Sequence, residues 1–81
     1  MTLDQLKPGQ VAVVVDVIGD DGIAMRLMEM GLTEGVEVRL IGTAPFGDPM
    51  EFELRGYHLS LRSTEARRVQ IRLVEHPESP A

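Results

Sequence analysis

The sequence contains no cysteine and no tryptophan, and its aromatic residues are limited to two phenylalanines and one tyrosine. Without cysteine, neither a disulfide nor a zinc–thiolate site can reinforce the core. A chain of 81 residues is expected to form one domain, and a domain of this size buries only about 60% of the surface that its unfolded chain exposes. The core must therefore be nearly continuous, and a closed or nearly closed β-sheet is an economical way to build one.

Long apolar segments and an excess of basic residues are also missing. The longest unbroken apolar run, residues 11–15, is far shorter than the roughly 20 residues of a membrane-spanning helix. Residues 1–5 lack the basic region of a secretory signal. The net charge of −5 disfavours nucleic-acid binding, because phosphate contacts require a basic surface. We therefore expect a cytoplasmic protein that does not insert into a membrane and does not bind nucleic acid.

Two segments with alternating apolar and polar residues, 36–41 and 51–55, flank a loop at residues 42–49. Alternation with a period of two is typical of β-strands that have one face on a core and one face in water. These segments therefore predict a long β-hairpin with a protruding tip.

The tip of this hairpin contains Pro45, Phe46, Gly47 and Asp48, followed by Pro49. Proline cannot donate a ladder hydrogen bond, and Gly47 with Asp48 supplies the backbone freedom that a chain reversal needs. An aromatic side chain on such a loop either folds back over one end of the core or stays exposed as an anchor for a partner. The sequence leaves both alternatives open for Phe46, and the four tip residues are candidate partner contacts.

A short helix is predicted between residues 20 and 30, after a Val-rich strand at residues 10–18. Asp20 or Asp21 is suited to cap its start, and Gly31 to end it in a left-handed conformation. Because both faces of the preceding strand are apolar, we expect the helix to cover the second face. Its inward stripe is predicted to be Ile23, Leu27 and Met30. The methionine group is interpreted as core packing rather than as a soft-metal site, and it comprises Met25, Met28 and Met30.

A two-residue turn at Arg55-Gly56 predicts the register of a second hairpin. It places Leu54 opposite Tyr57. Phe52 then lies opposite Leu59, with all four apolar side chains on one face, so Phe52 and Tyr57 are interpreted as core residues. The other expected elements are a lead-in turn at residues 3–6, a strand at 57–62, a helical turn at 63–66 and a last strand at 69–73.

Five short, mostly antiparallel strands with tight connections predict a mainly β fold, a small SH3-like barrel with one short α-helix between strands one and two. An OB-fold is the nearest alternative, but it more often places its helix between strands three and four. The predicted domain spans residues 1–74, and residues 75–81 are expected to form a disordered C-terminal tail. Because small barrels can pair through exposed edge strands, a homodimer is also considered.

Few residues are suited to catalysis or metal binding. His58 is predicted on the outer face of a strand, His76 lies in the tail, and no serine stands in a nucleophile motif. Glu51 and Glu53 are better explained as part of a solvated ion-pair face than as an acid–base pair. We therefore predict no enzymatic activity, no catalytic residue and no cofactor. The alternative is a weak surface site for Fe(II) or Zn(II) made by His58 and a nearby carboxylate.

Arginines are concentrated in the second half of the chain, at Arg62, Arg67, Arg68 and Arg72. Such a group is either a solvated face or a docking patch for an acidic protein surface, where charge sets the orientation and the association rate. Arg67 and Arg68 are therefore further candidate partner contacts.

Four segments carry a family resemblance: residues 26–32 (RLMEMGL), residues 35–38 (GVEV), residues 44–49 (APFGDP) and residues 55–62 (RGYHLSLR). Together they resemble the FeoA family of ferrous iron transport proteins. The resemblance extends over nearly the whole chain, from Leu3 to Leu73.

This resemblance implies an SH3-like barrel in the cytoplasm of a bacterium. It also implies a partner, the membrane permease FeoB with its cytosolic GTP-binding domain, on which this chain would dock to regulate Fe(II) uptake. The same fold resembles the C-terminal domain of iron-dependent repressors of the diphtheria-toxin-repressor type, some of which contribute metal ligands. The alternative implied function is therefore a divalent-metal-binding or metal-sensing domain. The resemblance supplies no catalytic residues.

Overall fold

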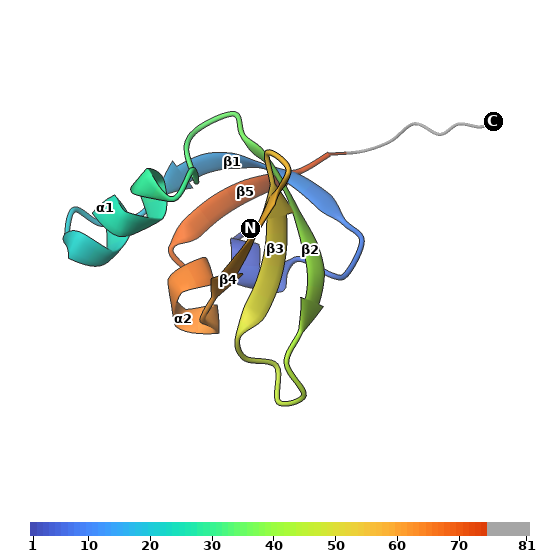
Figure 1. Cartoon of the computed structure of the whole chain (residues 1–81). Helices are drawn as coiled ribbons and strands as arrows, with labels where there is room; N and C mark the ends of the chain where they lie inside the picture. The colour runs from blue at the N-terminus through green and yellow to red at the C-terminus, as the bar shows by residue number, and fades with distance from the viewer. Residues whose placement is uncertain (75–81) are drawn as a thin grey trace.

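The computed structural model describes residues 1–74, and the predicted tail at residues 75–81 lies outside the described residues. Within the described part, five strands, two α-helices and one 3₁₀ turn follow one another (Figure 1). In chain order they are η1 (Leu3–Gln5), β1 (Val11–Val17), α1 (Gly22–Glu29), β2 (Glu37–Thr43), β3 (Met50–Leu54), β4 (Tyr57–Leu61), α2 (Ser63–Ala66) and β5 (Val69–Leu73).

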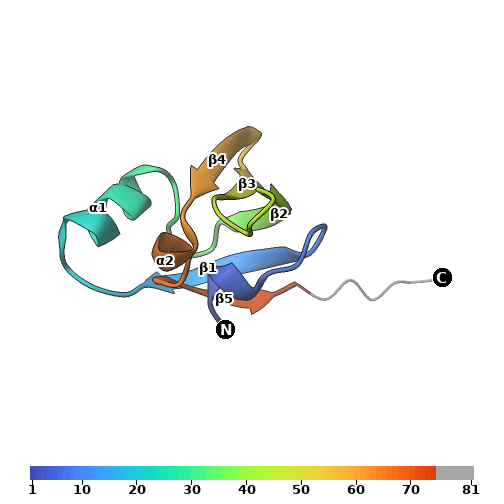
Figure 2. The same cartoon turned by 90° about the horizontal axis from the view of Figure 1, so that it is seen from below.

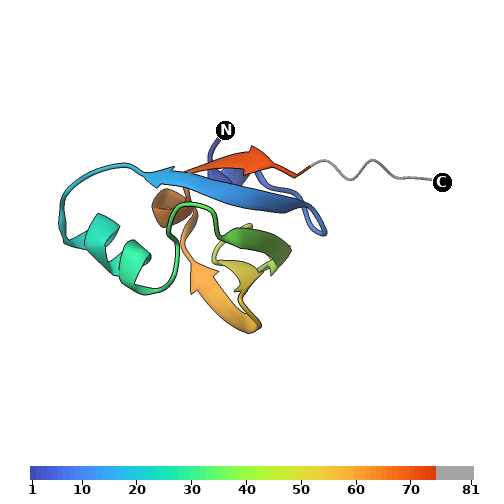
Figure 3. The same ribbon diagram turned by 90° about the horizontal axis from the view of Figure 1, so that it is seen from above.

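All of these strands belong to one antiparallel sheet in the order β4–β3–β2–β1–β5. The sheet curls so that β3 and β4 face β1 and β5 across the core, with α2 beside the opening between them (Figure 2, Figure 3). Helix α1 connects β1 to β2 and projects from one side, whereas the β2–β3 loop projects from one end (Figure 1). The predicted mainly β barrel with a helix between strands one and two is confirmed.

The core fills the inside of the curled sheet, and Phe52 is its largest fully buried side chain. Alternate residues of β2 and β3 point inward, as the period-two pattern predicts. Leu3 and Leu6, from the N-terminal turn, join the same cluster. The remaining buried members are Ala12, Val14, Val17, Ala24, Leu27, Leu32, Val36, Val38, Leu40, Met50, Leu54, Leu61, Ala66, Val69 and Ile71.

Strand β1 is buried on one face, and the prediction that a helix covers its second face is wrong. Ala12 and Val14 are buried, but Val15 is exposed. A register shift between Val14 and Asp16 in the pairing with β5 makes Val17 the next buried residue. A β-bulge of this kind inserts one residue and changes which face the later side chains occupy. Helix α1 lies beside the end of β1 rather than over it (Figure 1).

Helix α1 begins and ends as the sequence predicts. The Asp21 carboxylate accepts a hydrogen bond from the Ala24 N–H at 3.1 Å, which satisfies a free amide of the first turn. At the other end Gly31 has a φ of 108°. The Leu32 N–H donates to the Leu27 carbonyl at 3.2 Å, so a left-handed glycine and a returning backbone bond close the helix.

The buried face of α1 is narrower than predicted. Only Ala24 and Leu27 are fully buried within the helix, and Met30, just beyond it, is half-buried against the core. The exposed apolar side chains are Ile23, Met25 and Met28, with Met25 55% exposed. The interpretation of Met25 and Met28 as core residues is therefore wrong. The helical period shows which residues share a face, but it does not show how much of that face meets the barrel.

The β3–β4 hairpin has the predicted register, in which Leu54 pairs with Tyr57 and Phe52 with Leu59. Both residues of its turn have positive φ, 50° at Arg55 and 84° at Gly56. Two left-handed residues give the turn a twist that matches the flanking strands, which fixes the register.

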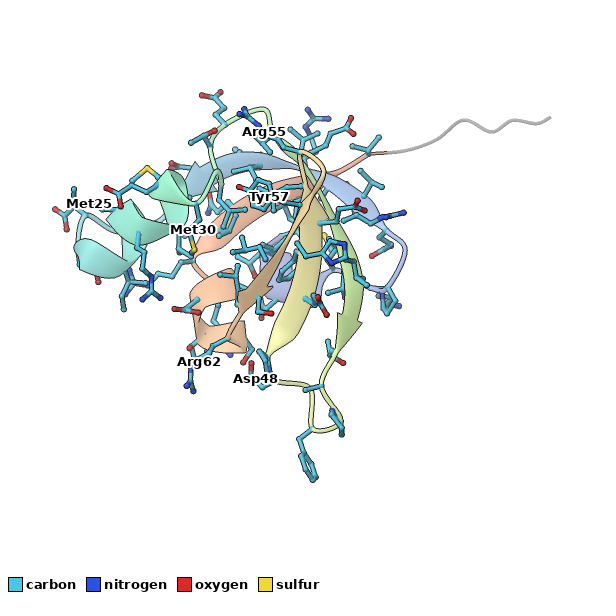
Figure 4. All side chains as sticks on the ribbon, viewed as in Figure 1. Met25, Met30, Asp48, Arg55, Tyr57 and Arg62 are labelled. Atoms are coloured by element: carbon cyan, nitrogen blue, oxygen red, sulfur yellow. The ribbon has the colours of Figure 1, made fainter. Side chains whose placement is uncertain are left out.

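Tyr57 occupies a different environment from the one predicted. It is 43% exposed, whereas Phe52 is fully buried as expected. The Tyr57 hydroxyl donates a hydrogen bond to the Met30 carbonyl, and the two residues lie near each other in Figure 4. Tyr57 therefore ties β4 to the end of helix α1 instead of filling the core.

Candidate docking loop

The loop between β2 and β3, residues 44–49, is closed by its own backbone. The Ala44 N–H donates to the Pro49 carbonyl at 3.0 Å, and the Gly47 N–H donates to the Ala44 carbonyl at 2.7 Å. Gly47 has a φ of 87°, which glycine adopts at little cost. The loop is therefore a tight turn with a defined path.

Asp48 joins this loop to helix α2. Its Oδ1 accepts a hydrogen bond from the Ser63 N–H at 2.7 Å, and its Oδ2 accepts one from the Ser63 hydroxyl at 3.0 Å. The first amides of a helix lack intrahelical acceptors and attract negative charge, so a carboxylate from the loop suits this position. Figure 4 shows Asp48 at the base of the loop, beside Arg62. Asp48 thus supports the loop and leaves its tip free.

Phe46 stands at the tip, and its residue surface is 99% exposed. The sequence left two alternatives for this side chain, and the structure shows the exposed one. The other phenylalanine, Phe52, is completely buried. A large aromatic side chain held in water on a braced loop is the kind of residue that contributes most when a partner covers it.

The two candidate arginines differ in how strongly their charges are already paired. Arg68 donates to both carboxylate oxygens of Asp21, at 2.8 and 2.9 Å. The hydrogen bond from Arg68, with the backbone N–H of Ala24, lowers the pKa of the Asp21 carboxyl to about 2, and Asp21 in turn raises the pKa of Arg68. Arg67 makes one longer contact, 3.7 Å from its Nε to Asp4, and its side chain is 66% exposed. Of the two, Arg67 has the charge that a partner can reach.

Helix α2 brings the candidate contacts of the loop and of the arginine pair near each other. Asp48 binds Ser63 at the start of α2, and Arg67 is the residue at its C-terminal cap. A helix of this length rises only about 6 Å. Arg67 and Arg68 also line an open surface hollow of about 270 Å³ with Ile18 and Thr64. The candidate partner contacts therefore lie on neighbouring parts of the surface.

His58 lies on the outer face of β4, and its nearest acidic partner is Glu51 on β3. The His58 Nδ1 is 3.5 Å from the Glu51 carboxylate, and both side chains are at least half exposed. Within residues 1–74, no group of three or more histidines and carboxylates is placed to hold a metal ion. Structural zinc takes four ligands, so these two side chains do not build a closed site.

Sequence reasoning missed the bond between Asp48 and Ser63, which determines how the loop is held. The two residues are 15 positions apart, and neither stands in a local capping motif with the other. The same is true of Asp21 and Arg68, which are 47 positions apart. Both pairs depend on the way the sheet folds back on itself, and local patterns contain no signal for this.

Within residues 1–74, no helix is long and apolar enough to cross a membrane. The fold and the projecting loop define the class of protein, a small SH3-like β-barrel domain. The chain belongs to the FeoA-domain family, whose family model matches residues 1–73, and this family is involved in ferrous iron transport.

Three relatives illustrate this similarity. A fusion of Fe(2+) transport protein A with the Fe(2+) transporter FeoB from Porphyromonas gingivalis is 32% identical over 74 residues, which are 91% of this chain and 9% of the fusion protein. The FeoA of Stenotrophomonas maltophilia, a zinc-complexed SH3-domain protein, is 37% identical with a TM-score of 0.79 over 89% of each chain. A FeoA-like protein from Clostridium acetobutylicum is 31% identical with a TM-score of 0.86, covering 98% of this chain and 93% of that one.

Metal-dependent regulators resemble this chain in fold only. The manganese-dependent transcriptional repressor in its complex with manganese is 14% identical, with a TM-score of 0.82 over 91% of this chain and 36% of the repressor. The predicted likeness to a domain of such repressors is confirmed at the level of fold. At this identity the likeness does not transfer any metal ligand to this chain.

Proposed function

We propose that this chain is a cytoplasmic accessory protein of ferrous iron uptake that docks on the cytosolic part of a FeoB-type GTP-binding permease and regulates it. The relative from Porphyromonas gingivalis supports this partner, because it joins a similar domain to the transporter in one polypeptide. Fusion keeps two modules at a high effective concentration, which is useful when the modules act on each other. The whole chain spans only a small part of that relative.

The observation that carries the proposal is the exposed Phe46 on its braced loop. Burying a phenylalanine side chain removes apolar surface from water and is worth about 1.5–3 kcal/mol. Because the loop is already closed by its backbone and by Asp48, little further ordering is needed when a partner covers the tip. Pro45, Phe46 and Gly47 are proposed to contact the permease, and Asp48 is proposed to hold them in place.

The arginines are proposed to contribute less to docking than Phe46 does. Arg68 is occupied by Asp21, so it is proposed to support the surface rather than to contact the partner through its guanidinium. Arg67 is proposed to face an acidic group of the permease at the rim of the contact, where a charge affects the association rate more than the affinity.

Regulation by docking requires no catalytic residue in this chain. Three carboxylates of the described part are paired with arginines: Glu53 with Arg39, Glu65 with Arg26 and Asp21 with Arg68. An acid–base group for catalysis would instead be directed at a substrate site. We therefore infer that the protein acts through binding and is not an enzyme.

The test is a calorimetric titration of the permease's purified cytosolic part with the wild-type chain and with Phe46→Ala. The expected result is an affinity at least about tenfold weaker for Phe46→Ala, which corresponds to the loss of one buried aromatic anchor. Met25→Ala is the matched control, because it also shortens an exposed apolar side chain but on helix α1. Equal affinities for the wild type and Phe46→Ala would exclude the loop as the anchor.

Divalent-metal binding is the second candidate, favoured by the contact between His58 and Glu51 and by the zinc-complexed FeoA of Stenotrophomonas maltophilia. Two exposed protein ligands predict weak binding, because the remaining positions must be filled by water or another molecule. Calorimetry with Fe(II) and Zn(II), on the wild type and on His58→Ala, tests whether this metal site exists. A site tighter than millimolar that disappears in His58→Ala would support metal binding, and no such site would end this alternative.

A further inference from the structure

The two edge strands of the sheet, β5 and β4, differ in whether other residues pair with their outer sides. At the β5 edge, the Ile71 N–H donates to the Met1 carbonyl at 2.9 Å, and Thr2 forms an antiparallel bridge with Gln70. The start of the chain therefore covers the outer side of β5. Among the described residues, strand β4 forms the opposite edge of the sheet and pairs only with β3.

The register of the β3–β4 hairpin shows which backbone groups of β4 point outward. Leu54 and Tyr57 close the two-residue turn, so they form a hydrogen-bonded pair, and this pattern alternates along an antiparallel ladder. The N–H and C=O groups of His58 and Ser60 consequently point away from β3. Among residues 1–74, no other backbone or side chain hydrogen-bonds to them.

The open stretch of this edge ends at Arg62. The Arg62 N–H donates to the Glu65 carboxylate at 2.9 Å, and its carbonyl accepts from the amides of Glu65 and Ala66 in helix α2. At the other end, the Arg55-Gly56 turn reverses the chain. The outward-facing groups of His58 and Ser60 are therefore a short, bounded segment of unpaired strand.

Strand β4 lacks several of the features that usually protect an exposed edge. Its sequence has no proline and no lysine, and its pairing with β3 runs without a register shift. By contrast, register shifts interrupt the pairings of β1 with β5 and of β2 with β3. An unprotected strand edge is a template for pairing with another strand.

We propose that β4 pairs antiparallel with β4 of a second copy of this chain, about a two-fold axis that passes beside Leu59. In this register His58 lies opposite Ser60 of the second copy, and Ser60 lies opposite His58. Each of these pairs exchanges both of its hydrogen bonds, because all the groups involved point outward. A symmetric contact between identical patches is the arrangement that a two-fold dimer requires.

The side chains that meet in this register are compatible with one another. Leu59, which is half-buried in one chain, faces its own copy across the axis. Tyr57, which is partly exposed, lies opposite Leu61 of the second copy. His58 faces the neutral Ser60, so no two like charges are directly opposed, whereas like charges opposite each other would destabilise the pairing.

The dimer is expected to be weak and favoured by salt. A contact limited to one short strand is smaller than a standard protein interface, and we expect a dissociation constant on the order of 100 µM. Each chain carries a net charge of −5, so added salt screens the repulsion between the two copies. Because the Phe46 loop joins β2 to β3, the pairing leaves that loop free and is independent of the docking proposed above.

Sedimentation equilibrium of the full chain tests the proposal, with Ser60→Pro and its matched control Ser60→Ala. Proline removes the outward N–H of position 60 without removing a β3–β4 hydrogen bond, whereas alanine keeps that N–H. The expected results are a monomer–dimer equilibrium for the wild type and Ser60→Ala, and dimerisation at least about tenfold weaker for Ser60→Pro. A wild type that is monomeric up to about 1 mM, or equal dimerisation of the proline and alanine variants, would overturn the proposal.

Amide hydrogen exchange in the wild type provides a test that does not depend on the folding of a variant. Protection of the His58 and Ser60 amides is expected to increase with protein concentration, because pairing gives these amides acceptors. The amides of Tyr57 and Leu59 serve as the internal reference, since they already face β3. Exchange at His58 and Ser60 that is independent of concentration would contradict the pairing.

Discussion

The barrel and helix α1 are held in place by different kinds of interaction. The barrel encloses a cluster of buried apolar side chains, in which Phe52 is the largest that is fully buried and which includes leucines from the N-terminal turn. Helix α1 adds only Ala24 and Leu27 to this cluster from its own length. It is instead tied at its edges by polar contacts: Asp21 with Arg68, Arg26 with Glu65, and the Met30 carbonyl with Tyr57.

This difference shows why the number of apolar residues in the sequence overestimates the number that are buried in the core. Met25 and Met28 are as apolar as residues of the barrel, yet they lie in water because the helix meets the barrel along a narrow strip. Exposed ion pairs hold such a helix weakly, since solvent and salt screen them. Changes in the barrel should therefore affect the free energy of unfolding much more than changes at the surface features.

The largest effect is expected for Phe52→Ala. Removing a completely buried aromatic side chain leaves a cavity and should lower the free energy of unfolding by about 3–5 kcal/mol. Urea unfolding followed by far-UV circular dichroism measures it, with Met25→Ala as the control on α1. A loss below about 1 kcal/mol would show that the barrel is not held by its apolar core.

A smaller effect is expected for Asp48→Ala, which removes the support between the loop and α2. Loss of a side chain that caps a helix amide typically costs about 1 kcal/mol. Asp48→Asn keeps an oxygen acceptor and should recover most of this loss. If the alanine and asparagine variants unfold at the same urea concentration, the bond to Ser63 does not stabilise the structure.

The contacts that hold the start of α1 should weaken at acidic pH. Because the pKa of Asp21 is lowered to about 2 in the folded state, the stability that its ionised carboxylate contributes is fully present above the ordinary pKa of an aspartate, about 4. It is lost as the pH falls from there through about 2. Protection of the Ala24 amide, which donates to Asp21, should therefore fall as the pH is lowered from about 4 to about 2, whereas protection of the amides of β3 should not.

The matched control for this titration is Arg68→Gln, which removes the main cause of the shift. In this variant the pKa of Asp21, followed by NMR, should rise toward its ordinary value. A pKa that stays near 2 without Arg68 would mean that the capping hydrogen bond alone accounts for the shift.

The smallest effect on stability is expected for Phe46→Ala. The side chain is almost fully exposed, so its removal should change the free energy of unfolding by no more than about 0.5 kcal/mol. Urea unfolding again gives the measurement. A clear destabilisation would show that Phe46 packs on the barrel and would remove the main argument for an anchor.

The sequence predicts the elements that depend on local patterns. Alternation predicts β2 and β3, and the Arg55-Gly56 turn predicts the register of β4. Asp20 or Asp21 is predicted to begin α1, which Asp21 does, and Gly31 is predicted to end it. These features succeed because each depends on residues only a few positions apart.

The features that the sequence does not predict depend on how distant segments meet. Nothing local indicates that α1 lies beside β1, so the exposure of Met28 and Val15 could not be inferred. The position of Tyr57 depends on a contact with the end of α1, and the support of the Phe46 loop depends on Ser63. The resemblance to the FeoA family predicts the fold, but it does not show which surface contacts a partner.

The most direct test of the docking account is Fe(II) uptake by bacterial cells that lack their own FeoA and carry this chain as the wild type or as Phe46→Ala. When the two kinds of cell contain equal amounts of their respective chains, we expect uptake in Phe46→Ala cells to fall toward that of cells without the protein. Uptake at the wild-type level in Phe46→Ala cells would contradict it.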